Sequence, residues 1–480
     1  MISFNYDSAK KQGILSGDLF EEIREKFSVK NESAAFIRNY RRYVPQRTYA
    51  ITPTGRFDIG LYFEIRKFII SLQYVDKIHT DDTLLEQLLP SKKLWAKDKE
   101  NVSLELQLRD YQTEIVNTCY NTGRGTIVLA TAGGKTLVIA SLLSNAFRET
   151  PRAKCLIIVP DLGLVNQTFS DFKNYNVNFT VSKFTGNNPL DLTANTIIAN
   201  LGILQSKNTN LEWLSQINYL VIDEVHKIRR GNEVNKIIKK ITTPFKFGFT
   251  GTLPENELDQ WNIIGKIGPI LYEKNSYELR LENFVSNVLV QVLEIIYKQK
   301  IENKQFSGIS DRFRAEQKFI INSEFRNKVI SKVIGNLKNN SLILIDFIEH
   351  GEIITQTLKS NCKDKDIFFI RGEVDVEERD KIKNLMEEKN NICVVAISKI
   401  FSTGINIKNL HYIVFAGGGI AKVKIIQSIG RGLRLHQDKD RLIIFDIADQ
   451  LYYGKQHNQK RLSLYQKENI KTNIKTIQEA

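Results

Sequence analysis

Residues 125–140 read GTIVLATAGGKTLVIA, and this stretch decides the fold. Its first six residues are mostly apolar and predict a strand that is buried on both faces, as in a parallel sheet. A glycine-rich turn then leads through Lys135-Thr136 into an apolar helical pattern. Strand, glycine loop, Lys-Thr and helix in this order predict a phosphate-binding loop, because backbone N–H groups and a helix N-terminus together hold phosphate oxygens.

The polar side chains of this loop have expected roles at a bound nucleotide. Lys135 is expected to reach the β- and γ-phosphates, and the Thr136 hydroxyl is expected to hold Mg²⁺. The strict pattern has glycine where this chain has Leu129, so a chance Gly-Lys-Thr in an ordinary turn is the alternative. The expected nucleotide contacts in the loop are Thr131, Ala132, Gly133, Gly134, Lys135 and Thr136.

A pair of acids follows a later apolar run, where residues 219–222 lead into Asp223-Glu224-Val225-His226. Carboxylates at the carboxyl end of a buried parallel strand lie where open α/β sheets bind ligands. Asp223 is expected to help hold Mg²⁺, and Glu224 to orient and deprotonate an attacking water. Asp-Glu alone is common in surface turns, but a phosphate loop and an acid pair on one sheet predict an NTPase.

Short apolar runs alternate with helical patterns on both sides of these motifs, which predicts two successive α/β domains with parallel sheets. The strands expected in the first domain are 125–130, 155–159, 196–199, 219–222 and 246–249. Those expected in the second are 341–346, 367–370, 392–396, 412–415 and 441–445. Residues 18–27 predict a short helix in a smaller α+β domain that precedes both.

These patterns predict five segments along the chain. They are an N-terminal DNA-binding accessory domain (1–95), an ATP-binding domain (96–275), a connector with a helical entry (276–321), a second α/β domain (322–450) and a basic tail, helical at best (451–480).

The charge of the chain favours a polyanionic partner. There are 68 Lys and Arg against 54 Asp and Glu, a net charge of +14. Basic side chains that neutralise phosphates release condensed counterions, so nucleic acid is the expected partner. The four cysteines are far apart and lack metal spacing, so no zinc site is expected. No signal peptide or membrane-spanning stretch is expected either, which predicts a cytoplasmic protein.

Further motifs, in order, resemble those of superfamily 2 helicases over residues 104–446. Arg109-Asp110-Tyr111-Gln112 is similar to the motif that reads adenine, and Thr250-Gly251-Thr252 to the motif that couples hydrolysis to domain movement. Residues 401–406 (FSTGIN) resemble the motif that faces both ATP and DNA. Residues 427–434 (QSIGRGLR) match Q-x-x-G-R-x-x-R.

The resemblance implies two RecA-like domains, ATP and Mg²⁺ as cofactors, and a role for each motif. Arg431 and Arg434 are expected to share one helix face and to stabilise charge on the γ-phosphate during hydrolysis. His226, Thr250 and Thr252 are expected to couple the site to domain movement. Further nucleotide contacts are expected from Arg109, Gln112, Gly404, Asn406 and Gln427.

The resemblance also implies where DNA is held, mostly through its phosphates. The expected contacts are Pro160, Thr185, Gly186, Arg371, Gly372, Ser402 and Thr403. A basic cluster with interleaved tyrosines, residues 38–47, adds Arg41 and Arg42 as candidate DNA contacts, although a solvated basic loop explains it as well.

Within the superfamily, the chain resembles the UvsW-type recombination helicases of tailed phages. The resemblance lies in His350-Gly351-Glu352, in residues 372–379 (GEVDVEER) and in the N-terminal Phe57-Asp58-Ile59-Gly60. It implies unwinding and branch migration of Holliday junctions, forks and D-loops in recombination, repair and replication restart, in the host cytoplasm if a phage encodes the chain. A DNA translocase subunit of a restriction-type complex and a non-enzymatic nucleic-acid binder are the alternatives, with RNA as a possible substrate.

Overall fold

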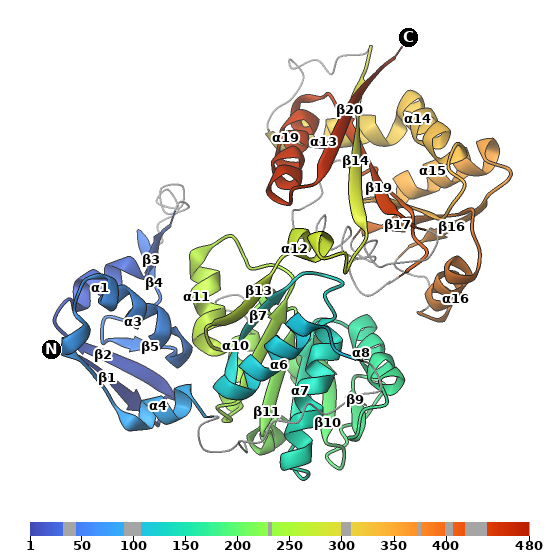
Figure 1. The fold of residues 1–480 in the computed structure, drawn as a ribbon. Helices are drawn as coiled ribbons and strands as arrows, with labels where there is room; N and C mark the ends of the chain where they lie inside the picture. The colour runs from blue at the N-terminus through green and yellow to red at the C-terminus, as the bar shows by residue number, and fades with distance from the viewer. Residues whose placement is uncertain are drawn as a thin grey trace. The chain divides into compact units, whose positions relative to one another are not determined.

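The computed structural model describes residues 1–31, 45–90, 107–228, 233–298, 309–371, 376–398, 407–417 and 439–479. The chain divides into two units, Met1–Leu129 with Gly134–Lys274 and Ala130–Gly133 with Asn275–Ala480. Each unit holds a seven-stranded sheet whose strands run parallel (Figure 1). The predicted fold class, two tandem RecA-like parallel-sheet domains with a small N-terminal α+β domain, is confirmed.

The N-terminal part of the first unit is a four-stranded mixed sheet in the order β5-β2-β1-β6. β1 (Ile2–Asp7) and β2 (Gln12–Gly17) are antiparallel, whereas β6 (Ile78–Thr80) runs parallel to β1. The remaining elements are α1 (Phe20–Lys26), β3 (Ser28–Lys30), β4 (Arg47–Tyr49), β5 (Arg56–Phe57), η2 (Ile59–Leu61), α3 (Tyr62–Ser71), η3 (Val75–Lys77) and α4 (Asp82–Leu88). α1 is the short helix predicted near residues 18–27.

This N-terminal part packs tightly on the parallel sheet of the same unit. Arg124, only 2% exposed at the start of β7, donates to the carbonyls of Ile267 (2.8 Å) and Gln87 (3.1 Å). Gly60 approaches the backbone of α11 (Glu257–Lys266) so closely that a Cβ on it would lie 2.1 Å from the Ile264 carbonyl oxygen. The two parts are therefore joined by the buried Arg124 side chain and by a backbone contact at Gly60 that leaves no room for a side chain.

The parallel sheet of the first unit has the order β13-β7-β12-β11-β8-β10-β9. Its strands are β7 (Arg124–Leu129), β8 (Cys155–Val159), β9 (Val181–Phe184), β10 (Thr196–Asn200), β11 (Tyr219–Asp223), β12 (Lys246–Thr250) and β13 (Ile270–Lys274). Its helices are α6 (Asp110–Thr122), α7 (Lys135–Glu149), α8 (Leu162–Asn174), α9 (Leu201–Gln205), η4 (Glu212–Gln216), η5 (Val225–Lys227), α10 (Glu233–Lys240) and α11. The five predicted strands are present, and β9 and β13 were not predicted.

The sheet of the second unit has the order β16-β17-β15-β18-β19-β14-β20. Its strands are β14 (Asn287–Ile296), β15 (Ser341–Ile345), β16 (Asp366–Ile370), β17 (Ile392–Ile397), β18 (Tyr412–Phe415), β19 (Arg441–Asp449) and β20 (Lys471–Gln478). Its helices are α12 (Ser276–Leu281), α13 (Ile309–Asn322), α14 (Glu324–Gly335), α15 (Ile348–Asn361), α16 (Val376–Glu388) and α19 (Tyr452–Lys467).

Two predictions about this unit are wrong. β14 falls inside the expected connector, but it is an inner strand that pairs with both β19 and β20. β20 falls inside the tail that was expected to be helical at best, and it is the edge strand of the sheet. Both strands pair with strands that are distant in the sequence, so the residues next to them in the chain do not indicate the pairing. The boundaries of the five expected segments stay predictions.

All four cysteines are buried free thiols. Within the described ranges, no helix combines the length and apolar character that crossing a membrane requires.

Candidate nucleotide-binding site

Three motifs follow strands of the first parallel sheet and meet at one edge of it. The phosphate loop follows β7, the acid pair ends β11, and Thr250 ends β12. β12 lies between β7 and β11 and is parallel to both, so the carboxyl ends of the three strands are neighbours. This is the edge at which parallel α/β sheets bind ligands.

The phosphate loop has the backbone that anion binding requires, in spite of its departure from the strict pattern. Ala132 and Gly134 have φ angles of 70° and 82°, and α7 begins directly after them at Lys135. Ala132 holds a left-handed conformation that costs an L-residue about 1–2 kcal/mol. The Lys135 Nζ lies 3.4 Å from the carbonyl oxygen of Leu129, so the side chain folds back over its own loop.

The predicted adenine motif lies against this loop. Gln112 is 3% exposed, and its Oε1 accepts the backbone N–H of Arg109 at 3.0 Å, at the start of α6. A Cβ on Gly134 would lie 2.4 Å from the Gln112 Nε2. The φ angle favours glycine at position 134, and a larger residue there would also displace the Gln112 amide. The contact of Arg109 and Gln112 with a base stays a prediction.

The acid pair is linked to Thr250 through His226. Glu224 has a φ angle of 54°, and its Oε2 lies 3.2 Å from the His226 Nδ1. The same Nδ1 lies 2.9 Å from the Thr250 Oγ1, which donates to the Thr252 carbonyl oxygen at 2.8 Å. The three residues predicted to couple the site to movement thus form one chain of contacts with Glu224. Backbone strain of the kind seen at Glu224 is commonly found at catalytic residues, which fits the role assigned to this side chain.

Burial affects the two carboxylates in different ways. It raises the pKa of Asp223, and the neighbouring Glu224 carboxylate raises it further. Burial also acts to raise the pKa of Glu224, but the positive charge of Lys135 and the contact with the His226 ring outweigh burial and lower it. Glu224 is therefore ionised at neutral pH and can accept a hydrogen bond from water.

One oxygen of this site is left for a ligand. The Glu224 Oε2 is buried, and its close contact with the His226 Nδ1, at 3.2 Å, lacks the alignment of a hydrogen bond. A buried carboxylate oxygen without a donor is costly unless water or a ligand supplies one. The Asp223 carboxylate and the Thr136 hydroxyl offer the oxygen ligands that Mg²⁺ prefers, so these residues fit the cation that the motifs imply.

The predicted DNA contacts of the first unit lie at the same edge of the sheet. Pro160 follows β8, and Thr185-Gly186 follow β9. The Thr185 hydroxyl is buried in its own turn and bonds the Asn188 Oδ1 at 2.9 Å. Gly186 is exposed, with no atom within 4 Å of the place where its Cβ would be. Thr185 thus shapes the turn, and Gly186 is the part that a strand could approach.

Of the predicted contacts in the second unit, Arg371 is described. It is half exposed and lies 3.3 Å from the Glu352 Oε1. The other predicted site residues, Arg41, Arg42, Gly372, Ser402, Thr403, Gly404, Asn406, Gln427, Arg431 and Arg434, lie outside the described residues.

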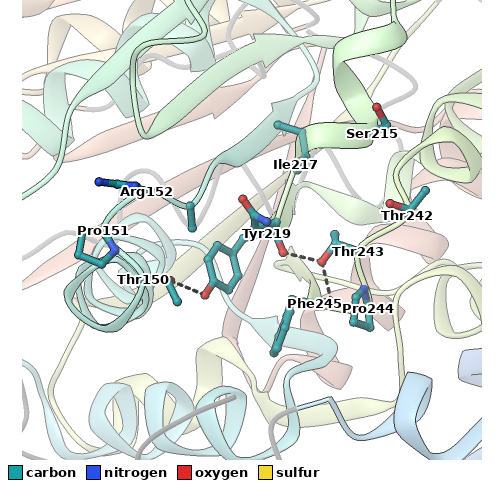
Figure 2. Close-up of a pocket in the computed structure, with 12 residues that line it drawn as sticks. Thr150, Pro151, Arg152, Ser215, Ile217, Tyr219, Thr242, Thr243, Pro244 and Phe245 are labelled. Carbon is teal, nitrogen blue, oxygen red and sulfur yellow. Dashed lines mark hydrogen bonds between the residues drawn. The ribbon is translucent and has the colours of Figure 1, made fainter. Parts of the chain in front are cut away.

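A pocket of 780 Å³ lies away from these motifs, at the amino ends of β8, β11 and β12 (Figure 2). Tyr219 forms part of its lining and lies 2.8 Å, hydroxyl to hydroxyl, from Thr150. The Thr243 hydroxyl donates to the Asn218 carbonyl oxygen at 2.5 Å. Because the nucleotide motifs lie at the carboxyl ends of the strands, this pocket belongs to the opposite edge of the sheet.

A phosphate loop, an acid pair and a hydroxyl motif on one parallel sheet, followed by a second parallel sheet, define a two-domain ATP-driven motor. Two family models match the chain, "Type III restriction enzyme, res subunit" over residues 105–255 and "Helicase conserved C-terminal domain" over residues 325–436. The chain is therefore a superfamily 2 helicase and an ATP hydrolase.

The chain is similar to several characterised or named proteins. The "ATP-dependent DNA helicase uvsW" of Enterobacteria phage T4 is 29% identical over 444 residues, which are 90% of this chain and 87% of that protein. The "DNA 3'-5' translocase XPB2" of Sulfurisphaera tokodaii is 23% identical, over 80% of this chain and 88% of that protein. The structure of the DUF1998 helicase MrfA bound to DNA and AMPPNP shares the fold, with a TM-score of 0.54 and 16% identity over 77% of this chain and 52% of that one.

Proposed function

We propose that this helicase acts on DNA and that it unwinds and branch-migrates Holliday junctions, forks and D-loops. The observation that supports the proposal most is the length of the similarity to UvsW. It covers 90% of the chain, so at most a tenth, about 48 of 480 residues, is left out. The similarity must therefore include part of residues 1–95, beyond both helicase models. Such a helicase would work in the cytoplasm of a phage-infected host.

The hydrolysis of ATP begins with Lys135, which is proposed to hold the β- and γ-phosphates. Thr136 and Asp223 would hold Mg²⁺, which neutralises charge on the phosphates when it is bound. Glu224 accepts a hydrogen bond from the attacking water and takes its proton as the oxygen–phosphorus bond forms. Arg431 and Arg434 are proposed to stabilise the charge that develops on the γ-phosphate, and ADP leaves.

The link from hydrolysis to movement is proposed to run through His226. Its ring contacts both Glu224 and the Thr250 hydroxyl, so a change of charge at Glu224 alters what the ring can donate to Thr250. Thr250 in turn holds the backbone of Thr252. DNA is proposed to be gripped by Pro160, Gly186 and Arg371, together with the expected contacts outside the described residues.

The deciding experiment compares ATP-dependent unwinding of three DNA substrates of equal base-pair content: a four-way junction, a fork and a simple tailed duplex. A rate on the first two that exceeds the rate on the tailed duplex supports branch migration. Preference for the tailed duplex would instead identify a plain translocating helicase. A matched set built from RNA tests the choice of nucleic acid.

A DNA translocase without strand separation is the second candidate, because the family model over residues 105–255 is named for a restriction subunit. Displacement of a third strand from a fully duplex track, with no release of either duplex strand, would favour this candidate. Release of duplex strands from junctions would exclude it.

A further inference from the structure

We propose that Arg326 is a positioning residue for ATP hydrolysis, which holds the backbone at the carboxyl end of β18 for the arginines that follow in the chain. Residues 418–438 come directly after this point and carry Gln427, Arg431 and Arg434. The inference rests on the role proposed above for Arg431.

Arg326 lies in α14 and is fully buried. Its Nε donates to the Asp449 Oδ1 at 2.7 Å, and one terminal nitrogen donates to the Asp449 Oδ2 at 3.1 Å. That same nitrogen donates to the carbonyl oxygen of Ala416 at 2.8 Å. The other terminal nitrogen lies 3.3 Å from the His350 Nε2. One guanidinium thus ties α14, α15 and the carboxyl ends of β18 and β19 together.

The backbone beyond β18 is held from its other side by β15. The N–H groups of Ala416 and Gly417 both donate to the Leu344 carbonyl oxygen, at 2.9 and 3.1 Å. A Cβ on Gly417 would lie 2.6 Å from a carboxylate oxygen of Asp346. Both polar backbone groups of Ala416 therefore have partners, and Arg326 supplies the one that comes from a side chain.

Stability alone does not explain this arrangement. Removing an arginine and a carboxylate from water is expensive, and well-packed apolar side chains often serve a core as well or better. A planar guanidinium fixes several partners in one geometry, which neither an apolar side chain nor a lysine can do. Burial and the charge of Arg326 lower the pKa of His350 to about 3, so His350 stays neutral and its Nε2 can accept.

The second unit contains a matched control. Arg461 in α19 donates to the Asp446 Oδ2 at 2.8 Å, and both side chains are buried. This is also a buried ion pair between an arginine and an aspartate of β19, but within the described ranges its guanidinium bonds Asp446 and not the backbone of Ala416. Comparing Arg326→Lys with Arg461→Lys therefore separates the loss of a buried ion pair from the loss of the Ala416 contact.

The test is a double-mutant cycle in the full chain, with DNA-stimulated ATP hydrolysis as the readout. Arg326→Lys is expected to lower kcat by about 10- to 100-fold, the effect of a small misplacement of a catalytic group, and to leave KM for ATP within about twofold. Arg461→Lys is expected to leave kcat within about twofold while it lowers the melting temperature similarly. In an Arg431→Ala background, Arg326→Lys is expected to cost less than about twofold, because residues that act as a unit are not additive.

The inference is overturned if Arg326→Lys lowers kcat by the same factor with and without Arg431, or if Arg461→Lys has the same effect. If Arg326→Lys does not fold, His350→Leu takes its place in the cycle, with an expected loss of about threefold in kcat that disappears in the Arg431→Ala background. An unchanged kcat in His350→Leu overturns the inference. If Arg431→Ala alone hydrolyses ATP at the wild-type rate, the proposed role of Arg431 is overturned. The cycle therefore distinguishes failure of the proposed function from failure of the role inferred for Arg326.

Discussion

At the scale of single residues, Asp223 and Glu224 are neighbours in the chain with different chemistry. Glu224 has a positive φ angle, and Lys135 and His226 favour the ionised form of its carboxylate. The Glu224 Oε2 contacts the His226 Nδ1 at 3.2 Å without the alignment of a hydrogen bond, so it can still accept one from water. At Asp223 burial is not outweighed by nearby positive charge, so its pKa is raised, and a bound cation would favour its ionised form.

Glu224→Gln is expected to bind ATP but not to turn it over. The amide keeps the size of the side chain but cannot take a proton from water, so kcat should fall by about 10²–10⁴-fold, the range of general base catalysis. The measurement is nucleotide binding by fluorescence beside steady-state hydrolysis. Lys135→Ala is the companion variant, which should lose hydrolysis altogether. Undiminished hydrolysis in Glu224→Gln would remove this residue from its assigned role.

The protonation of Asp223 predicts how Mg²⁺ use depends on pH. Its pKa is raised to about 6 by burial and by Glu224, so protons compete with the cation as pH falls. The Mg²⁺ concentration for half-maximal hydrolysis should be about fourfold higher at about pH 5.5 than at about pH 7.5. An Asp223 with an ordinary pKa would show almost no change over this interval, and that result would contradict the burial described for it.

At the scale of elements, the strands buried on both faces could be predicted from the sequence, whereas the exposed β20 and the half-buried β9, β13 and β14 could not. β7, β8 and β11 are runs of apolar residues buried on both faces, and such runs are evident in any window. β20 is largely exposed, and β14 joins it to β19 across a long stretch of chain. Their strand character comes from pairing partners that a local pattern does not contain.

Gly60 tests how the N-terminal part is joined to the first parallel sheet. Gly60→Ala would place a methyl group against the Ile264 carbonyl oxygen in α11, where neither backbone can move alone. Overpacking of this kind should destabilise the first unit by about 1–3 kcal/mol. The measurement is the denaturant midpoint of unfolding. Gly186→Ala is the control, since open space surrounds that position. Equal denaturant midpoints for the two variants would show that the backbones at Gly60 and Ile264 can move apart to accept the methyl group.

At the scale of the whole molecule, the nucleotide site could be predicted further than the DNA site. Lys135, Asp223, Glu224 and Thr250 occur in short motifs with fixed chemistry, and the strand order brings them to one edge. DNA contacts depend on phosphates held by scattered side chains, which leave no comparable pattern in the sequence. Arg326 carried no sequence signal at all, because a single arginine in a helix is ordinarily a solvated one.

The net charge of +14 makes salt dependence the most direct probe of the DNA site. If Arg41 and Arg42 contact phosphates, replacing both with Gln removes two counterion-releasing contacts. The slope of log K against log salt should then become less steep by about 1.8 for duplex arms, at 0.9 per phosphate. Basal ATP hydrolysis should change little, because neither side chain is assigned to the nucleotide.

Arg47→Gln is the matched control within the same basic cluster, since Arg47 lies 2.9 Å from the Glu25 carboxylate and is already neutralised. Affinity for a four-way junction, measured at several salt concentrations, decides the matter. An unchanged slope in the double variant, or an equal change in Arg47→Gln, would mean that the cluster is a solvated loop and that the junction is held elsewhere.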